Sequence, residues 1–161
     1  MTPKLRSGLV LAGFIGLCLA VGALGGWVTA PAVAEWYPTL NKPSWNPPDW
    51  VFAPVWTTLY ILMAVAAWLV WKRGQTGAAI KGAMTLFFSQ LLLNLAWSFL
   101  FFGARQPGTA FVEILMLWAA LLATLIAFWR LSKPAGALLL PYLAWVSFAA
   151  VLNYTVWQLN P

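Results

Sequence analysis

Three apolar stretches of this sequence place aromatic rings and polar side chains on one face of a helix. The sets are Trp56, Tyr60, Met63 and Ala67; Gln90, Asn94 and Trp97; and Tyr142, Trp145, Ala149 and Asn153. Their members recur at intervals of three and four residues, which is the spacing of one helical stripe. A cavity lined by flat rings with few polar groups suits a flat, apolar ligand such as a porphyrin or a sterol. The residues alone do not choose between these ligands.

Each stripe also has a purely structural interpretation. The stripe that begins at Trp56 is consistent with packing core, although the Tyr60 hydroxyl needs a partner at that depth. The amides of Gln90 and Asn94 are costly in hydrocarbon unless they are paired. They would serve either as polar contacts between helices, which are common in membranes, or as ligand contacts. The two roles are compatible.

A proline- and tryptophan-rich segment, LNKPSWNPPDWVFAPVWTTLY, occupies residues 40–60. Residues that precede proline are pushed to extended geometry, so the first half of the segment cannot be helical throughout. Asp49 is a good N-cap for a following helix, and Pro54 falls where a missing N–H costs little. The segment is therefore a rigid loop that leads into a helix. It is either a stiff aromatic anchor or a lid whose Trp45 and Trp50 roof a cavity.

The composition is that of a membrane protein. Of the 161 residues, 63% are hydrophobic and only 7% are charged, against roughly 25% charged residues in soluble domains. With no histidine, one cysteine and three acids, the chain lacks the groups for an internal disulfide, a His/Cys zinc site or ordinary acid–base hydrolysis. We expect no metal, no resident cofactor and no nucleic-acid partner.

Five stretches reach the length of about 20 apolar residues that a membrane-spanning helix needs. They cover residues 8–28, 50–71, 83–102, 109–129 and 135–157. The loops between them are short except the first, residues 29–49. The sequence thus predicts an all-α integral membrane protein, a single five-helix transmembrane bundle whose long first loop is a cavity lid.

Lysine and arginine are distributed unequally between the two sides of the predicted bundle. The N-terminus and the second and fourth loops hold Lys4, Arg6, Lys72, Arg73, Lys81, Arg130 and Lys133, whereas the first and third loops hold Lys42 and Arg105. The positive-inside rule then predicts a cytoplasmic N-terminus and an outer C-terminus, in a bacterial membrane or an organelle membrane. Five spans place the two termini on opposite sides of the membrane, so the span count and the charge distribution give the same topology.

Two features at span ends have competing interpretations. Lys4 and Arg6, an apolar run and then Ala32-Val33-Ala34 resemble a cleavable signal peptide. The run is long for such a peptide, and the GxxxG from Gly22 to Gly26 favours a retained helix that contacts another. In the fourth span, Glu113 is interpreted as a near-surface acid at a helix start, where acids are favoured, or as a residue close to Arg105 at the interface.

The sequence resembles the translocator protein family, also called tryptophan-rich sensory proteins or peripheral benzodiazepine receptors. Three segments carry the resemblance, which covers nearly the whole chain: WYPTLNKPSWNPPDWVFAPVWTTLY, FFGARQ and PYLAWVSFAAVLNYTVW. It implies a five-helix bundle, often dimeric, that binds tetrapyrroles and, in some members, cholesterol or benzodiazepine-type drugs. Members have been assigned to bacterial and mitochondrial outer membranes.

The resemblance also implies roles for individual residues. Trp56 and Trp145 match two cavity tryptophans linked to porphyrin binding and, in some members, to light-dependent porphyrin breakdown. Asn94 matches a polar cavity residue, Tyr60 a cavity-lining position and Ala149 a small wall position near the ligand. Separately from the family motifs, we expect Lys42, which lies in the proline- and tryptophan-rich segment, to meet a porphyrin carboxylate at the membrane surface. In the cholesterol-recognition pattern a basic residue follows Tyr154, but Gln158 occupies that place here, so tetrapyrrole binding is favoured over cholesterol.

Three functions follow as alternatives. The first is a receptor or carrier that binds tetrapyrroles such as protoporphyrin IX or haem, with a regulatory or transport role. The second is an enzyme that degrades protoporphyrin in light through Trp56 and Trp145. The third is a structural or stress-regulatory membrane protein that acts through partners, with the cavity incidental. For any of the three we expect membrane lipids as neighbours and a homodimer.

Overall fold

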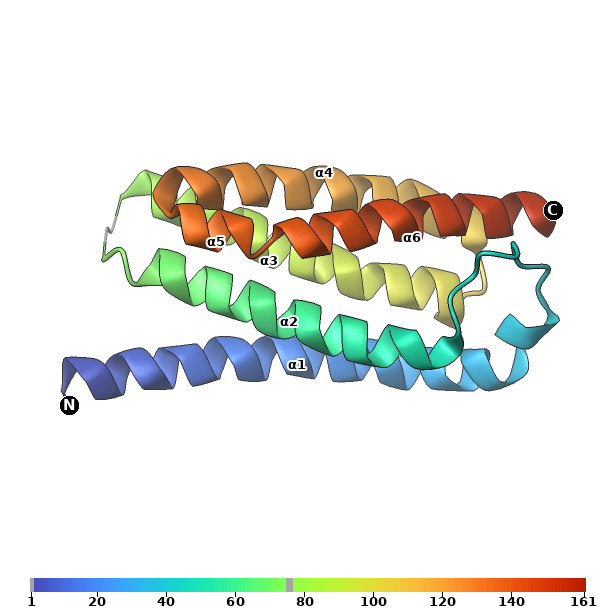
Figure 1. The fold of residues 1–161 in the computed structure, drawn as a ribbon, viewed down its shortest axis with the longest axis horizontal. Helices are drawn as coiled ribbons and strands as arrows, with labels where there is room; N and C mark the ends of the chain where they lie inside the picture. The colour runs from blue at the N-terminus through green and yellow to red at the C-terminus, as the bar shows by residue number, and fades with distance from the viewer. Residues whose placement is uncertain (1, 75–76) are drawn as a thin grey trace.

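Long apolar runs dictate helices here, because backbone polar groups in hydrocarbon must be satisfied within their own segment. The computed structural model describes residues 2–74 and 77–161, and these form a bundle of roughly antiparallel helices (Figure 1). The elements are α1 (Pro3–Glu35), η1 (Tyr37–Thr39), α2 (Asp49–Trp71), α3 (Ala78–Ser98), η2 (Phe99–Gly103), α4 (Pro107–Leu131), α5 (Lys133–Ala137) and α6 (Leu140–Leu159).

Among the described residues, five segments are long and apolar enough to cross a membrane. Three of them are α1, α2 and α4, and the other two join neighbouring elements, α3 with η2 and α5 with α6. The described part of the chain contains no strand. The predicted all-helical, five-span membrane fold is confirmed.

The first helix is longer than the apolar run that predicts it. It continues past residue 28 to Glu35, with Pro31 inside it. The residues after Trp27 are mostly small and apolar, and they continue the helix although Pro31 lacks an N–H. The first loop is accordingly residues 36–48, and it carries the single turn η1.

The last span is interrupted near its beginning. α5 ends at Ala137, and α6 begins at Leu140 after a short turn. Pro141 lies in the first turn of α6 and has no N–H to donate to the preceding turn, so a continuous helix is disfavoured there. The break changes the direction of the chain just before the stripe that begins at Tyr142.

The end of the third span winds more widely than an α-helix. In η2 the N–H of Ala104 bonds the carbonyl of Phe99 at 2.7 Å, which is an interval of five residues. Arg105 then adopts a left-handed backbone with φ of 55°. Such π-type turns are rare and frequently lie at functional sites, and this one places Phe101 and Phe102 at the cavity described below.

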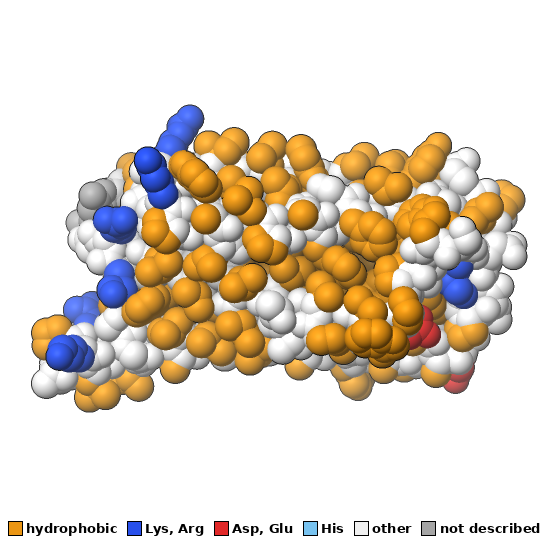
Figure 2. Space-filling view, viewed as in Figure 1, with side chains coloured by type: hydrophobic (Ala, Val, Ile, Leu, Met, Phe, Trp, Pro, Cys, Tyr) orange, Lys and Arg blue, Asp and Glu red, His pale blue; other side chains and the backbone are white. Residues whose placement is uncertain are grey.

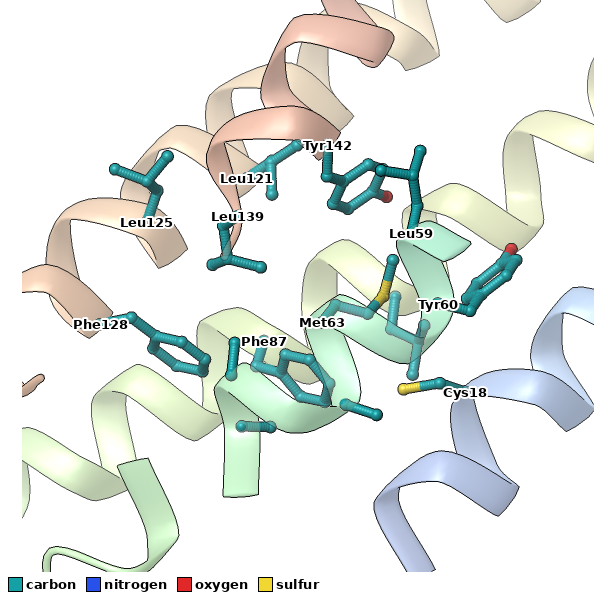
Figure 3. Close-up of a cluster of buried hydrophobic side chains, with 14 of the residues drawn as sticks. Cys18, Leu59, Tyr60, Met63, Phe87, Leu121, Leu125, Phe128, Leu139 and Tyr142 are labelled. Carbon is teal, nitrogen blue, oxygen red and sulfur yellow. The ribbon is translucent and has the colours of Figure 1, made fainter. Parts of the chain in front are cut away.

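The larger of the two buried hydrophobic clusters is centred in the half of the bundle that holds the α2–α3 and α4–α5 connections. Figure 3 shows Met63, Phe87, Leu121, Phe128 and Leu139 meeting there from α2, α3, α4 and the α5–α6 turn. These side chains are almost completely buried. The other half of the bundle is less tightly filled, and it holds the cavity.

Exposed charged side chains lie toward the ends of the bundle on the face that Figure 2 shows. The termini lie at opposite ends (Figure 1). On the visible face, lysines and arginines gather at the N-terminal end, apolar side chains cover the middle, and the few acids lie toward the other end (Figure 2). This apolar belt is what a helix bundle needs to face hydrocarbon.

A close contact at the α4–α5 corner gives a test of the packing. A Cβ added at Gly136 would lie 2.8 Å from the Trp129 backbone Cα. Because that atom cannot move away as a side chain can, we expect Gly136→Ala to destabilise the fold by about 1–3 kcal/mol. Gly82→Ala is the matched control, since nothing lies within 4 Å of its added Cβ and alanine favours helices. Chemical unfolding in detergent micelles measures both, and equal stabilities would contradict this packing.

Candidate ligand cavity

A cavity of about 470 Å³ lies among α1, α2, α6 and the end of α3, beneath the first loop. This volume is in the range of small-molecule sites, about 300–1,000 Å³. Its aromatic wall consists of Tyr37, Phe52, Trp56, Tyr60, Trp97, Phe101, Phe102, Trp145 and Phe148. Small residues of α1 and Ala149 of α6 complete the wall. The arrangement offers flat apolar surfaces with a few fixed polar groups.

The polar centre of the cavity is Asn94. The Tyr60 hydroxyl donates to its side-chain oxygen at 2.5 Å, and its side-chain nitrogen donates to the Tyr142 hydroxyl at 2.8 Å. Tyr60 and Asn94 line the cavity, whereas Tyr142 is fully buried behind the wall. One amide therefore joins α2, α3 and α6, so the predicted roles as helix contact and as cavity residue coincide.

A second amide fixes the other end of the wall. The indole N–H of Trp97 donates to the Asn153 side-chain oxygen at 2.9 Å, and the Asn153 nitrogen donates to the Pro107 carbonyl at 2.7 Å. Trp97 and Asn153 both line the cavity. The indole orientation is thus set by α6, which is itself tied to the beginning of α4.

The predicted site residues divide into two groups. Six of them line the cavity: Trp56, Tyr60, Asn94, Trp97, Trp145 and Ala149. The other four are outside its lining: Trp45, Trp50, Gln90 and Tyr142. Met63 and Ala67, which share the stripe of Trp56, are fully buried core. A stripe can thus be cavity wall at one end and packing core at the other.

Trp45 of the first loop and Trp50 of α2 do not face the cavity directly. Trp45 is 46% exposed, and its ring packs edge-on against Phe148 with 5.9 Å between centroids. Phe148 lines the cavity, so Trp45 forms an outer layer. Trp50 is 75% exposed at the beginning of α2. The loop residue that reaches the cavity is instead Tyr37, together with Asp49 where α2 begins.

Two buried polar residues have no hydrogen-bond partner among the described residues. Both amide atoms of Gln90 and both carboxyl oxygens of Glu113 are in this state. Glu113 is only 4% exposed, so the prediction of a near-surface acid is wrong. It lies three residues after Ala110 and four before Leu117, both buried, so it belongs to the inward stripe of α4.

Hydrogen bonds hold the first loop over the end of the bundle. Asn160, after α6, accepts from the Asn41 backbone N–H and donates to the Asn41 carbonyl, both at 2.9 Å. The Lys42 ammonium donates to the carbonyls of Tyr37 at 2.7 Å and Leu40 at 3.2 Å. Lys42 is thus engaged within the loop and does not line the cavity.

Tyr37 is the buried anchor of this loop. Its hydroxyl donates to Asn46 at 2.8 Å, and its ring packs against Phe102. Burial and the nearby Asp49 carboxylate raise the pKa of Tyr37 to about 12. The neutral phenol is therefore the form that the folded loop accommodates.

Sequence reasoning missed the contribution of α1 to the site. Leu19, Gly22 and Gly25 line the cavity, and a Cβ added at Gly22 would lie 2.6 Å from the Tyr60 ring. The absence of a side chain there lets α1 approach Tyr60 closely. The GxxxG from Gly22 to Gly26 was a signal for helix contact, but it carried no sign of a cavity.

Comparisons with known proteins agree with this architecture. The sequence matches the TspO/MBR family over residues 14–158. It is 51% identical over 153 residues to the tryptophan-rich protein TspO of Chlorobaculum tepidum, covering 95% of this chain and 97% of that protein. It is 49% identical over 128 residues to the translocator protein of Homo sapiens, covering 78% and 75%. It is 41% identical over 126 residues to the tryptophan-rich sensory protein of Cereibacter sphaeroides, covering 78% and 77%.

The Asn94 bridge predicts a non-additive mutational effect. Asn94→Leu keeps the volume but leaves the Tyr142 hydroxyl buried without its partner, which we expect to cost about 1–2 kcal/mol. Tyr142→Phe in the Asn94→Leu background should recover the part of that loss that comes from the unpaired Tyr142 hydroxyl, while the Tyr60 hydroxyl, which lines the cavity, stays without its Asn94 partner. Unfolding of the two single variants and the double variant measures the coupling. If the losses in free energy of unfolding of the two single variants add up to that of the double variant, the hydrogen-bond bridge is contradicted.

Because the neutral Tyr37 side chain anchors the first loop, we expect the stability of the fold to fall at alkaline pH. The pKa of Tyr37 in the fold is about 12, while that of an unfolded tyrosine is about 10. The stability it contributes is fully present below pH 10 and declines as pH rises toward 12. Tyr37→Phe should remove this part of the alkaline loss, at a cost of about 1 kcal/mol at neutral pH for the Asn46 bond. Tyrosinate absorbance of the wild type minus that of Tyr37→Phe reports the titration directly. A midpoint near 10 would refute the buried anchor.

Proposed function

This chain belongs to the TspO/MBR family, and on that premise we propose that it binds a tetrapyrrole such as protoporphyrin IX or haem in the cavity beneath its first loop. The observation that carries the proposal is the wall of aromatic rings around one fixed amide, Asn94. A flat macrocycle can lie against such rings with its apolar faces removed from water. Trp56 and Trp145, on facing helices, are the residues that would hold it.

The chemistry of the site suits binding of an uncharged ring system. The Trp56 ring packs against both Tyr60 and Tyr142, with centroids 5.8 and 6.1 Å apart, so its orientation is fixed before a ligand arrives. Preorganised rings of this kind lower the entropic cost of binding. Propionate groups of the ligand would remain at the loop end. Lys42 could donate there only with the third N–H of its ammonium, because two carbonyls already use the others.

The first loop serves as the lid of this cavity in our proposal. Its role is to keep water out rather than to stack on the ligand with Trp45 and Trp50, since both of these lie outside the cavity lining. Asn160 and Lys42 hold the loop in place by the bonds described above. The protein would act as a receptor or carrier in a bacterial or organelle membrane, with a cytoplasmic N-terminus, an outer C-terminus and a homodimeric assembly.

Sterols are a weaker candidate for the same role. The segment that resembles the cholesterol-recognition pattern contains Tyr154, which is 46% exposed and packs against Phe111 and Trp157. It lies on the outer face of α6 and is not part of the cavity lining. With Gln158 in place of the basic residue, this surface offers a sterol hydroxyl no cation. Benzodiazepine-type drugs, by contrast, would share the cavity.

Light-dependent porphyrin breakdown remains the second candidate function. The observation that favours it is that Trp56 and Trp145 both line one cavity, where either indole could exchange an electron with an excited macrocycle. Loss of porphyrin absorbance in light but not in darkness, at a rate lowered by Trp56→Phe plus Trp145→Phe, would establish it. If the double variant bleaches as fast as the wild type, these indoles have no such part.

The binding proposal predicts a specific loss of affinity. Protoporphyrin IX is titrated in the dark into protein in nanodiscs, with tryptophan quenching as the signal. We expect saturable quenching, weakened about tenfold in Trp56→Phe plus Trp145→Phe because two ring contacts are reduced. Trp27→Phe plus Trp129→Phe is the control, since it also removes two indoles and neither lines the cavity. Identical curves for both double variants would contradict the proposal.

A further inference from the structure

We propose that the ligand enters and leaves the cavity sideways, from the hydrocarbon of the bilayer, through an apolar groove between α2 and α6 that Trp145 closes. This inference rests on the proposed function, because it concerns the route to the same cavity. It does not follow from that function, since a ligand could equally arrive from water beneath the first loop. Four features of the structure favour the lateral route.

The first feature is the groove itself. It is lined on one side by Pro54, Thr58 and Leu62 of α2 and on the other by Pro141 and Ala144 of α6. Pro54, Thr58, Pro141 and Ala144 are all exposed, so the groove opens on the outer surface of the bundle. At 1.5 Å per residue it runs roughly 8 to 20 Å from the beginning of α2, which is within a hydrocarbon core of about 30 Å.

The second feature is its chemistry. The one hydroxyl of the lining belongs to Thr58, and it already donates to the Pro54 carbonyl at 2.8 Å. Apart from the buried indole nitrogen of Trp145, the described groove lining therefore offers no free side-chain hydrogen-bonding group. A lipid chain would fill the groove at rest, and the apolar ring of a macrocycle could displace that chain while the propionate groups stay at the loop end of the bilayer.

The third feature is continuity with the cavity. Trp145 and Phe148 line both the groove and the cavity, so these two rings are the partition between them. Ala144 and Trp145 are neighbours on α6. Ala144 lines the groove alone, whereas Trp145 lines both the groove and the cavity. Moving the Trp145 ring would join them.

The fourth feature is the way the Trp145 indole is held, compared with three other tryptophans of the bundle. Trp97 donates to Asn153 at 2.9 Å, Trp118 donates to Ser147 at 2.8 Å, and Trp68 donates to Ser7. The indole nitrogen of Trp145, in contrast, is buried and has no partner among the described residues. Only packing against Phe52 and Phe148 is seen to orient this ring. Trp145 can therefore turn without breaking a hydrogen bond.

The route from water is closed more firmly. To lift the loop, the chain would have to break the two hydrogen bonds between the Asn41 backbone and the Asn160 side-chain amide, both 2.9 Å long. Displacing Tyr37 from the cavity would also break its 2.8 Å bond to Asn46. Opening the loop thus costs several hydrogen bonds, whereas turning Trp145 costs none of those seen in the fold.

Kinetics separate the two routes. Because Kd depends only on the end states, a residue on the path that does not touch the bound ligand changes the association and dissociation rates by one common factor. Ala144→Phe fills the groove from α6, and Thr58→Phe fills it from α2. We expect each to slow both rates by about tenfold while Kd changes less than about twofold. Stopped-flow quenching with protoporphyrin IX in nanodiscs of one lipid composition measures the rates.

Two further variants complete the experiment. Val151→Phe adds the same ring to the lipid-exposed face of α6 two turns beyond Ala144, lines neither space and should leave both rates unchanged. Asn160→Ala releases the loop. Unchanged rates in both groove variants, or faster rates in Asn160→Ala, would overturn the lateral route while saturable binding persists. A wild type without saturable binding would instead remove the proposed function, and the route with it.

Discussion

The side-chain amide of Asn94 is the interaction around which this bundle is arranged. It accepts a hydrogen bond from the Tyr60 hydroxyl at 2.5 Å and donates one to the Tyr142 hydroxyl at 2.8 Å. In hydrocarbon none of these groups has water as an alternative partner, so the three helices that carry them are held in one register. The rotation of α2, α3 and α6 that satisfies the bridge also turns Trp56, Trp97 and Trp145 toward one space. The cavity is thus a consequence of satisfying the polar groups.

Irregular backbone then shapes the space that the bridge creates. The break between α5 and α6 at Pro141 redirects the last span before its aromatic stripe begins. The wide turn of η2 places Phe101 and Phe102 in the cavity lining. On the remaining side, Gly22 lets α1 lie against Tyr60, where any larger residue would collide. A straight, uniformly packed bundle would bring large side chains into this volume, so the departures from ideal geometry keep it open.

The sequence predicts much of this because hydrocarbon imposes simple rules. Apolar length identifies five spans, and three-and-four spacing identifies the inward faces of α2, α3 and α6. Spacing cannot say where along a face packing ends and cavity begins, so Trp56 and Met63 look alike although only Trp56 reaches the cavity. The loop is set by long-range bonds such as Asn41 to Asn160, which no local pattern reveals, so sequence reasoning could not show that Trp45 and Trp50 lie outside the cavity lining. Glu113 resembles a surface acid because only the packing of α4 turns it inward.

The central claim is that the aromatic cavity, and not the membrane surface, holds the macrocycle. Indole N–H signals in the nuclear magnetic resonance spectrum of ¹⁵N-labelled protein test this most directly, because a bound porphyrin shifts nearby protons by its ring current. With signals assigned by single Trp→Phe variants, the account predicts large shifts for Trp56, Trp97 and Trp145 on adding protoporphyrin IX. Trp27 and Trp129, outside the cavity lining, should move little. Shifts confined to the latter pair would mean that porphyrin lies only in the surrounding lipid, and the cavity would lose its proposed role.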